Sequence, residues 1–125
     1  MGVVASVVVP PLGRALDRAA VAEGVQRFAA AHAAARELAI ARGTLARLEI
    51  DRAAGTAAVS VQRTATVWDT VATYVLGSAR ITCSNPTLVF NPIGLGYGTS
   101  NTRVVFARGA AVDTVTTSRT GRLRR

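Results

Sequence analysis

VAEGVQRFAAAHAAARELAIARG, residues 21–43, is the stretch of sequence that decides the fold. Its apolar side chains recur at spacings of three and four residues, which is typical of an α-helix with one buried face. The stripe consists of Val21, Val25, Phe28, His32, Ala35 and Ala39, with Leu38 beside it. Alanine favours the helix from Leu12 onward, and Gly43 provides a natural C-terminal cap. We predict an amphipathic helix over 14–43 whose stripe packs on the rest of the chain.

An apolar run precedes this helix. Gly2 to Val9 contain five Val and no charge, and Pro10 and Pro11 follow. A membrane-spanning helix needs about 20 apolar residues, so this run cannot cross a bilayer unaided. A secretory signal peptide fits no better, because no basic region precedes the run and no small-residue cleavage pattern follows it. Taken alone, the segment looks like half of a longer element.

The pattern after Gly43 changes to a period of two with many β-branched residues, which is typical of strands. The segments 45–50 and 57–63 flank a turn in which Gly55 makes a hairpin. Further strands are predicted at 64–68, 71–75, 79–83, 87–90, 103–107, 112–118 and 121–124. These short strands predict a small antiparallel sheet or a pair of sheets over 44–125. The fold class is therefore α+β, with one long N-terminal helix packed on a small β domain.

Composition and charge limit the function classes. With 125 residues, half of them hydrophobic, the chain is expected to form one folded domain. All 15 basic residues are Arg, against 7 acidic residues, for a net charge of +8. Six of these Arg and a single acid, Asp113, fall from Arg103 onward. Cys83 is the only cysteine, so no intrachain disulfide forms, and we interpret it as a small buried hydrophobic residue.

Candidate catalytic and ligand-binding motifs are weak. Gly94, Gly96 and Gly98 resemble a dinucleotide fingerprint, but a predicted strand follows them instead of the helix that would hold pyrophosphate. His32 is the only histidine, so a metal site with three or four ligands is not expected. No serine lies in a nucleophile elbow. We therefore expect no catalytic residue, cofactor or metal, and a small enzyme or soluble ligand-binding domain is the least favoured hypothesis.

The C-terminal segment SRTGRLRR, residues 118–125, carries the densest positive charge. In a strand, Arg122 and Arg124 would lie on one face and Leu123 on the other. Two guanidinium groups about 7 Å apart match the spacing of successive phosphates along a nucleic-acid strand. Arg119 and Arg125 would extend this patch. The alternative, a solvated and frayed basic tail, remains open.

Three stretches together resemble the type IV pilin-like superfamily, and within it the GspH/FimT group of minor pseudopilins and minor pilins. GVVASVVVPPL resembles the second half of the pilin hydrophobic helix. The segment 25–43 resembles the end of the group's helix, at Ala35, Arg36, Ala39, Arg42 and Gly43. The ending resembles the group's F-x-P-x-G loop and its terminal S-x-x-GR-x-R strand, at Phe90, Pro92, Gly94, Ser118, Gly121, Arg122 and Arg124.

The resemblance implies a pilin-type helix on two small sheets and a structural function without catalytic residues. Residues 1–13 would be the remainder of the hydrophobic helix, and Gly2 to Leu12 would bundle with other subunits of a type II secretion pseudopilus or a type IV pilus. Val21, Val25, Phe28 and His32 would hold the helix on the β domain. The implied partners are other pilins or pseudopilins and the inner-membrane assembly platform. The implied location is the bacterial inner membrane, as a single-pass protein with a periplasmic C-terminal domain, and then the filament.

One departure from the family pattern concerns the N-terminus. Members of the superfamily begin with a basic leader, a site for prepilin peptidase and the first half of the apolar helix, and these do not precede Gly2. We expect the native chain to continue upstream, so that the peptidase is also a partner.

A second function follows from the same resemblance. In FimT-type members a C-terminal GRxR motif is associated with DNA binding, and Gly121 to Arg124 resemble that motif. The DNA-binding residues that this resemblance implies are Arg119, Arg122, Arg124 and Arg125. GspH-type members also often end in a GR phrase, so the sequence leaves both functions open.

Overall fold

A computed structural model describes residues 2–98 and 100–125, with side chains from Leu12 onward except at residue 99. The described part of the chain contains one helix, α1 (Gly2–Arg42), followed by strands only. The strands are β1 (Ala46–Asp51), β2 (Thr56–Gln62), β3 (Trp68–Val75), β4 (Arg80–Cys83), β5 (Thr87–Phe90), β6 (Thr102–Arg108), β7 (Ala111–Thr117) and β8 (Leu123–Arg124).

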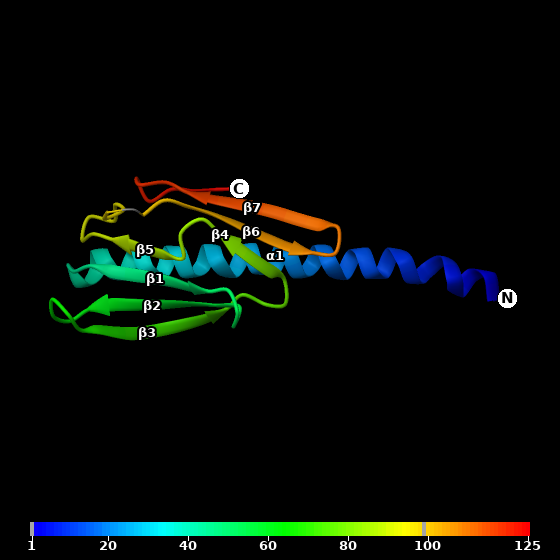
Figure 1. Ribbon diagram of the computed structural model, residues 1–125, viewed down its shortest axis with the longest axis horizontal. Coiled ribbons are helices and arrows are strands. Elements are labelled where there is room, and N and C mark those ends of the chain that lie inside the picture. The colour runs from blue at the N-terminus through cyan, green and yellow to red at the C-terminus, as the bar shows by residue number, and fades with distance from the viewer. Residues whose placement is uncertain (1, 99) are drawn as a thin grey trace.

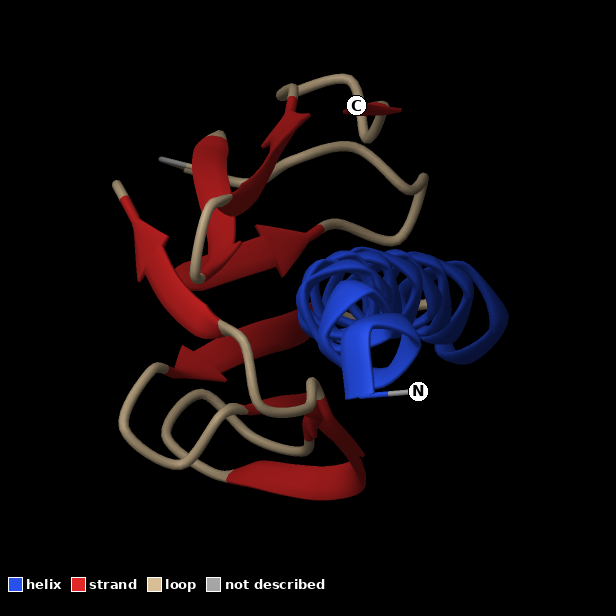
Figure 2. Cartoon of the chain, turned by 90° about the vertical axis from the view of Figure 1, so that its right-hand side faces the viewer, coloured by secondary structure: helices blue, strands red, loops and turns tan. Residues whose placement is uncertain are grey.

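The strands form two four-stranded sheets. The first sheet has the order β3-β2-β1-β5, the second has the order β4-β6-β7-β8, and all neighbouring strands are antiparallel. Both sheets lie along the same helix, and in the view of Figure 1 β2 and β3 lie below it and β7 lies above it. Viewed along the helix axis, the sheets curve around one side of α1 and leave its other side open (Figure 2). The predicted α+β fold is confirmed.

The buried stripe of α1 joins the helix to both sheets. Val21, Val25, Phe28 and His32 are all buried. The Phe28 ring packs against Phe106 of β6 in the second sheet, with ring centroids 6.3 Å apart. One turn further on, His32 stands edge-on to Phe90 of β5 in the first sheet, at 5.0 Å between centroids. The helix therefore makes one buried ring-to-ring contact with each sheet.

Two predicted chain reversals are confirmed. Gly43 has a φ of +60°, and the Thr44 amide donates to the Ala39 carbonyl at 3.3 Å, which closes the end of α1. Gly55 has a φ of +68°, and its amide donates to the Asp51 carbonyl at 2.8 Å in the β1–β2 hairpin. Glycine adopts this left-handed backbone without the steric cost that a side chain would add.

The prediction of separate strands at 64–68 and 71–75 is wrong. A turn occupies residues 64–67, where the Val67 amide donates to the Thr64 hydroxyl at 3.2 Å, and one continuous strand, β3, then begins at Trp68. The pairing of β3 with β2 shifts register between Val59 and Ser60, which leaves Val71 of β3 as an extra residue. A bulge of this kind breaks the alternation of faces, so the sequence pattern reads as two strands.

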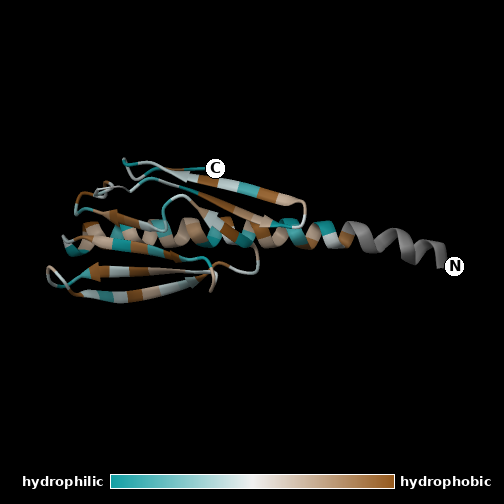
Figure 3. Ribbon diagram, in the orientation of Figure 1, coloured by the Kyte–Doolittle hydropathy of each residue, from teal (hydrophilic) through white to brown (hydrophobic). Residues whose placement is uncertain are grey.

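The N-terminal part of α1 extends beyond both sheets (Figure 1). Residue 1 and the side chains of residues 2–11, which the sequence assigns to the hydrophobic helix, lie outside the described part. Within the described residues, no helix has the length and apolarity to cross a membrane. Figure 3 shows hydrophobic and hydrophilic residues mixed along α1 where it meets the sheets.

Gly24 allows α1 to approach the second sheet closely. A Cβ at this position would lie 2.6 Å from Cδ1 of Phe106, whose side chain is fully buried, and 3.3 Å from the Leu76 carbonyl oxygen. We expect Gly24→Ala to lower the free energy of unfolding by about 1–3 kcal/mol, because overpacking outweighs the better helix propensity of alanine. Urea unfolding followed by circular dichroism measures this difference.

Gly13 provides the matched control, because it lies in the same helix and a Cβ there would meet nothing within 4 Å. Gly13→Ala is expected to leave the free energy of unfolding unchanged or slightly raised. If Gly24→Ala were as stable as Gly13→Ala, the close approach of α1 to Phe106 would be contradicted.

Candidate functional site

The C-terminal segment is folded back into the second sheet. Thr116 and Thr117 of β7 pair with Arg124 and Leu123 of β8. A tight turn connects the two strands, in which the Ser118 amide donates to the Arg122 carbonyl at 2.8 Å and the Gly121 amide donates to the Ser118 carbonyl at 3.1 Å. The segment is therefore ordered by the sheet, and the alternative of a frayed tail is not supported.

The turn is held in place by a backbone contact with the glycine-rich loop. Gly121 has a φ of +79°, and a Cβ on it would lie 2.6 Å from the Gly94 carbonyl oxygen. The same carbonyl accepts a hydrogen bond from Nε of Arg36 in α1, at 3.0 Å. Next to it, the Gly96 amide donates to the Arg119 carbonyl at 2.7 Å. The helix, the loop and the C-terminal turn thus meet at one point.

This meeting point joins residues from two of the three stretches that carried the family resemblance. Arg36 belongs to the segment 25–43. Gly94 and Gly121 belong to the ending, Gly94 in its F-x-P-x-G loop and Gly121 in its S-x-x-GR-x-R strand. The contact of Arg36 could not be predicted, since nothing local in the sequence shows which backbone carbonyl a helix arginine reaches. Both glycines are required by close approach as well as by positive φ.

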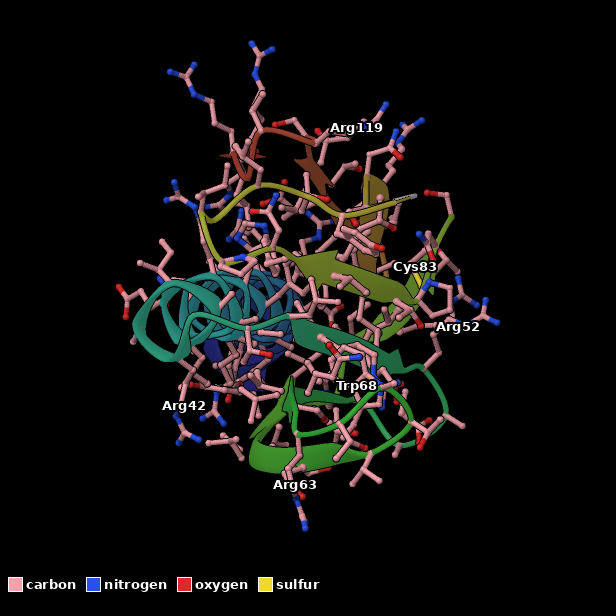
Figure 4. All side chains as sticks on the ribbon, turned by 90° about the vertical axis from the view of Figure 1, so that its left-hand side faces the viewer. Arg42, Arg52, Arg63, Trp68, Cys83 and Arg119 are labelled. Carbon is pink, nitrogen blue, oxygen red and sulfur yellow. The ribbon has the colours of Figure 1, made fainter. Side chains whose placement is uncertain are left out.

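The structure brings Arg122 and Arg124 together. Both are exposed, and they line one open hollow of about 590 Å³ with Ser118 and Leu123. Leu123 packs against the hydrophobic core, which is the alternation expected of a strand. Arg119 lies in the turn at the top of the molecule in Figure 4, on the side opposite to Arg63.

Arg125 is placed apart from the other three arginines. Its Nε donates to Oδ2 of Asp113 at 2.7 Å. Asp113 pairs with Phe106 in the sheet and so lies on the face toward α1, where Arg125 and Arg18 line a separate hollow. Arg125 is therefore neutralised by an ion pair and faces away from Arg122 and Arg124.

His32 is the most strongly perturbed titratable group. Its side chain lies in the core, 4% exposed, and among the described residues its Nε2 has no hydrogen-bond partner. Burial, and to a smaller degree the positive charge of Arg36, lowers its pKa from 6.5 to about 4. The imidazole is thus neutral at pH 7 and serves as a packing group.

The other candidate residues do not form a reaction centre in the described part of the chain. Cys83 is half-buried, and burial raises the pKa of its thiol, which makes it a poor nucleophile at pH 7. No three His, Cys, Asp or Glu side chains of the described residues gather as metal ligands. The next element after Gly94 to Gly98 is strand β6, and no helix in the described residues begins at this loop.

Comparison with known proteins points to one fold. The sequence matches no protein-family model and no curated protein. Among solved structures, the type IV minor pilin FimU of Pseudomonas aeruginosa is similar at a TM-score of 0.68 and 11% identity, over 83% of this chain and 86% of that one. The minor pseudopilin EpsH of the Vibrio cholerae type 2 secretion system is similar at a TM-score of 0.66 and 17% identity, over 86% of this chain and 95% of that one. The chain has the fold of these minor pilins and pseudopilins.

Proposed function

We propose that this chain is a minor pilin or minor pseudopilin of the GspH/FimT type, a structural subunit that assembles with other pilin-like subunits through α1. The observation that carries the proposal is the part of α1 that extends beyond both sheets (Figure 1). Leu12 and Leu16 lie one turn apart in the N-terminal half of α1, and they are 57% and 55% exposed. Large apolar side chains in such positions favour packing against another protein.

In this proposal the chain has three working parts. Residues 1–13 bundle with the equivalent helices of neighbouring subunits, 14–43 hold the helix on the sheets, and 44–125 form the β domain that faces outward. The chain needs no catalytic group, because assembly relies on helix packing alone.

The proposal also includes the location and the remaining partners. Before assembly the subunit waits at the bacterial inner membrane, with both sheets in the periplasm, and an assembly platform there delivers it to the filament. Prepilin peptidase processes the chain if a leader precedes it. The similarity to FimU and EpsH, a minor pilin and a minor pseudopilin, supports this placement.

The proposed function is tested by deleting the gene in the producing bacterium and counting surface pili and secreted proteins separately. We expect the deletion to reduce one of the two, and the affected one identifies the system. The wild-type chain should restore it, whereas Leu12→Arg should not, because a charge on the exposed helix face blocks packing. Ile93→Arg, in an exposed loop, is the matched control and should restore it fully. Unchanged pili and unchanged secretion would contradict the proposal.

A second candidate function is DNA capture by Arg119, Arg122 and Arg124. The favouring observation is that these three side chains are exposed and that no described carboxylate forms an ion pair with them. Binding of double-stranded DNA should weaken as salt is added. A plot of the logarithm of the binding constant against the logarithm of the salt concentration should fall with a slope of about 0.9 per phosphate contact. Arg122→Ala with Arg124→Ala should flatten this slope, and binding that keeps the wild-type slope would contradict the candidate function.

A further inference from the structure

The strand pairing of the second sheet fixes which side chains share its outer face. Residues directly opposite each other in an antiparallel sheet point to the same side. The inward face is marked by the buried Ile81, Val104, Phe106 and Val115. The outward positions are Arg80 and Thr82 of β4; Arg103, Val105 and Ala107 of β6; Val112, Thr114 and Thr116 of β7; and Arg124 of β8.

Arg103 and Arg124 lie in one row across this face. Arg103 pairs with Thr116, and Thr116 pairs with Arg124, so a threonine separates the two arginines. Two strand spacings put their Cα atoms about 10 Å apart. Arg80 extends the charge to the other edge of the sheet, where it pairs with Ala107.

The outer face carries no carboxylate at any of these outward positions. The only acidic residue of the second sheet is Asp113, which points inward and pairs with Arg125. Within the described residues, no ion pair neutralises Arg80, Arg103 or Arg124. The only charges at the outward positions are therefore positive, and Arg124 makes the face continuous with the hollow that it lines with Arg122.

The side chains between the arginines indicate what this face can bind. Threonine hydroxyls and arginine guanidinium groups both donate hydrogen bonds to phosphate oxygens. The outward positions hold no aromatic residue, so the face offers no platform on which unpaired bases could stack. Such a surface suits the backbone of a duplex, which presents phosphates and keeps its bases paired.

We propose that the outer face of the second sheet binds the phosphate backbone of double-stranded nucleic acid without sequence preference, with Arg103 at its centre and Arg80 at its far edge. This inference rests on the second candidate function and extends it from the C-terminal turn to β6 and β4. Arg103 was missed as a site residue because its row partners become known only from the strand order.

The experiment measures the affinity of the full chain for a mixed-sequence DNA duplex over a range of salt concentrations. Arg103→Ala should reduce the log-log slope by about 0.9, the value of one phosphate contact. Arg103→Lys should restore the slope, because the charge returns. Arg42→Ala is the matched control, since it removes one exposed charge at the end of α1 that forms no ion pair within the described residues and lies far from Arg119 in Figure 4, and it should keep the wild-type slope.

Three outcomes would overturn the inference. If Arg103→Ala behaves like Arg42→Ala while the double variant at Arg122 and Arg124 loses binding, the site is confined to the C-terminal turn and the second candidate function survives. If the wild-type chain binds no duplex, both proposals fall. If it binds phosphatidylserine vesicles but no duplex, the face recognises anionic lipid instead.

Discussion

Replacing Phe28 with alanine is expected to lower the free energy of unfolding by about 3–5 kcal/mol, the range for deleting a large buried aromatic side chain. The Phe28 side chain is fully buried and packs against Phe106 and against His32, each at 6.3 Å between ring centroids. Its removal leaves a cavity between α1 and the second sheet. Urea unfolding followed by Trp68 fluorescence and by circular dichroism measures the loss.

Leu16→Ala is the matched control for this prediction. Leu16 lies on the same helix but is 55% exposed. Its truncation should change the free energy of unfolding by less than about 0.5 kcal/mol. A small effect of Phe28→Ala, comparable to that of Leu16→Ala, would mean that α1 does not rest on the second sheet through this ring.

Acidification from pH 6.5 to pH 4 is expected to remove about 3 kcal/mol of stability through His32, because each pKa unit corresponds to about 1.4 kcal/mol. The folded-state pKa of about 4 lies below the ordinary value of 6.5, so the unfolded chain binds the proton more readily in this window. The contribution is complete above pH 6.5 and is lost as the pH falls towards 4. Unfolding free energies measured at several pH values give the slope.

His32→Leu isolates this contribution, because leucine fills similar space without a titratable nitrogen. Carboxyl groups such as that of Asp69, whose pKa is lowered first by its hydrogen bond to Arg63, titrate in both proteins and cancel in the comparison. The variant should show a flatter pH profile between 4 and 6.5 than the wild-type chain. Parallel profiles would show that His32 is not held neutral by burial.

Local sequence patterns predicted most of the fold. The helix and its end at Gly43 follow from a single periodicity and a single glycine, and the β1–β2 hairpin follows from Gly55. The start of β3 was not predictable in this way, because the turn at 64–67 is made of residues that also favour strands. Its bulge at Val71 depends on pairing with β2, which only the folded sheet defines.

The candidate site was predictable only in part. Alternation along one strand correctly separates Leu123 from Arg122 and Arg124. The ion pair of Arg125 with Asp113 depends on the register between β7 and β8, and the support of Gly94 by Arg36 joins residues 58 positions apart. Contacts of this kind follow from how the elements pack against each other. The periodicity of a single segment does not show which other segment it packs against.

The shared helix has a mechanical consequence. Each sheet has one apolar face, and α1 covers both, so neither sheet can lose the helix and remain shielded from water. A pull along the helix axis therefore loads the two sheets together in shear. The subunit should resist such tension as a unit and then yield in one step, without releasing either sheet first.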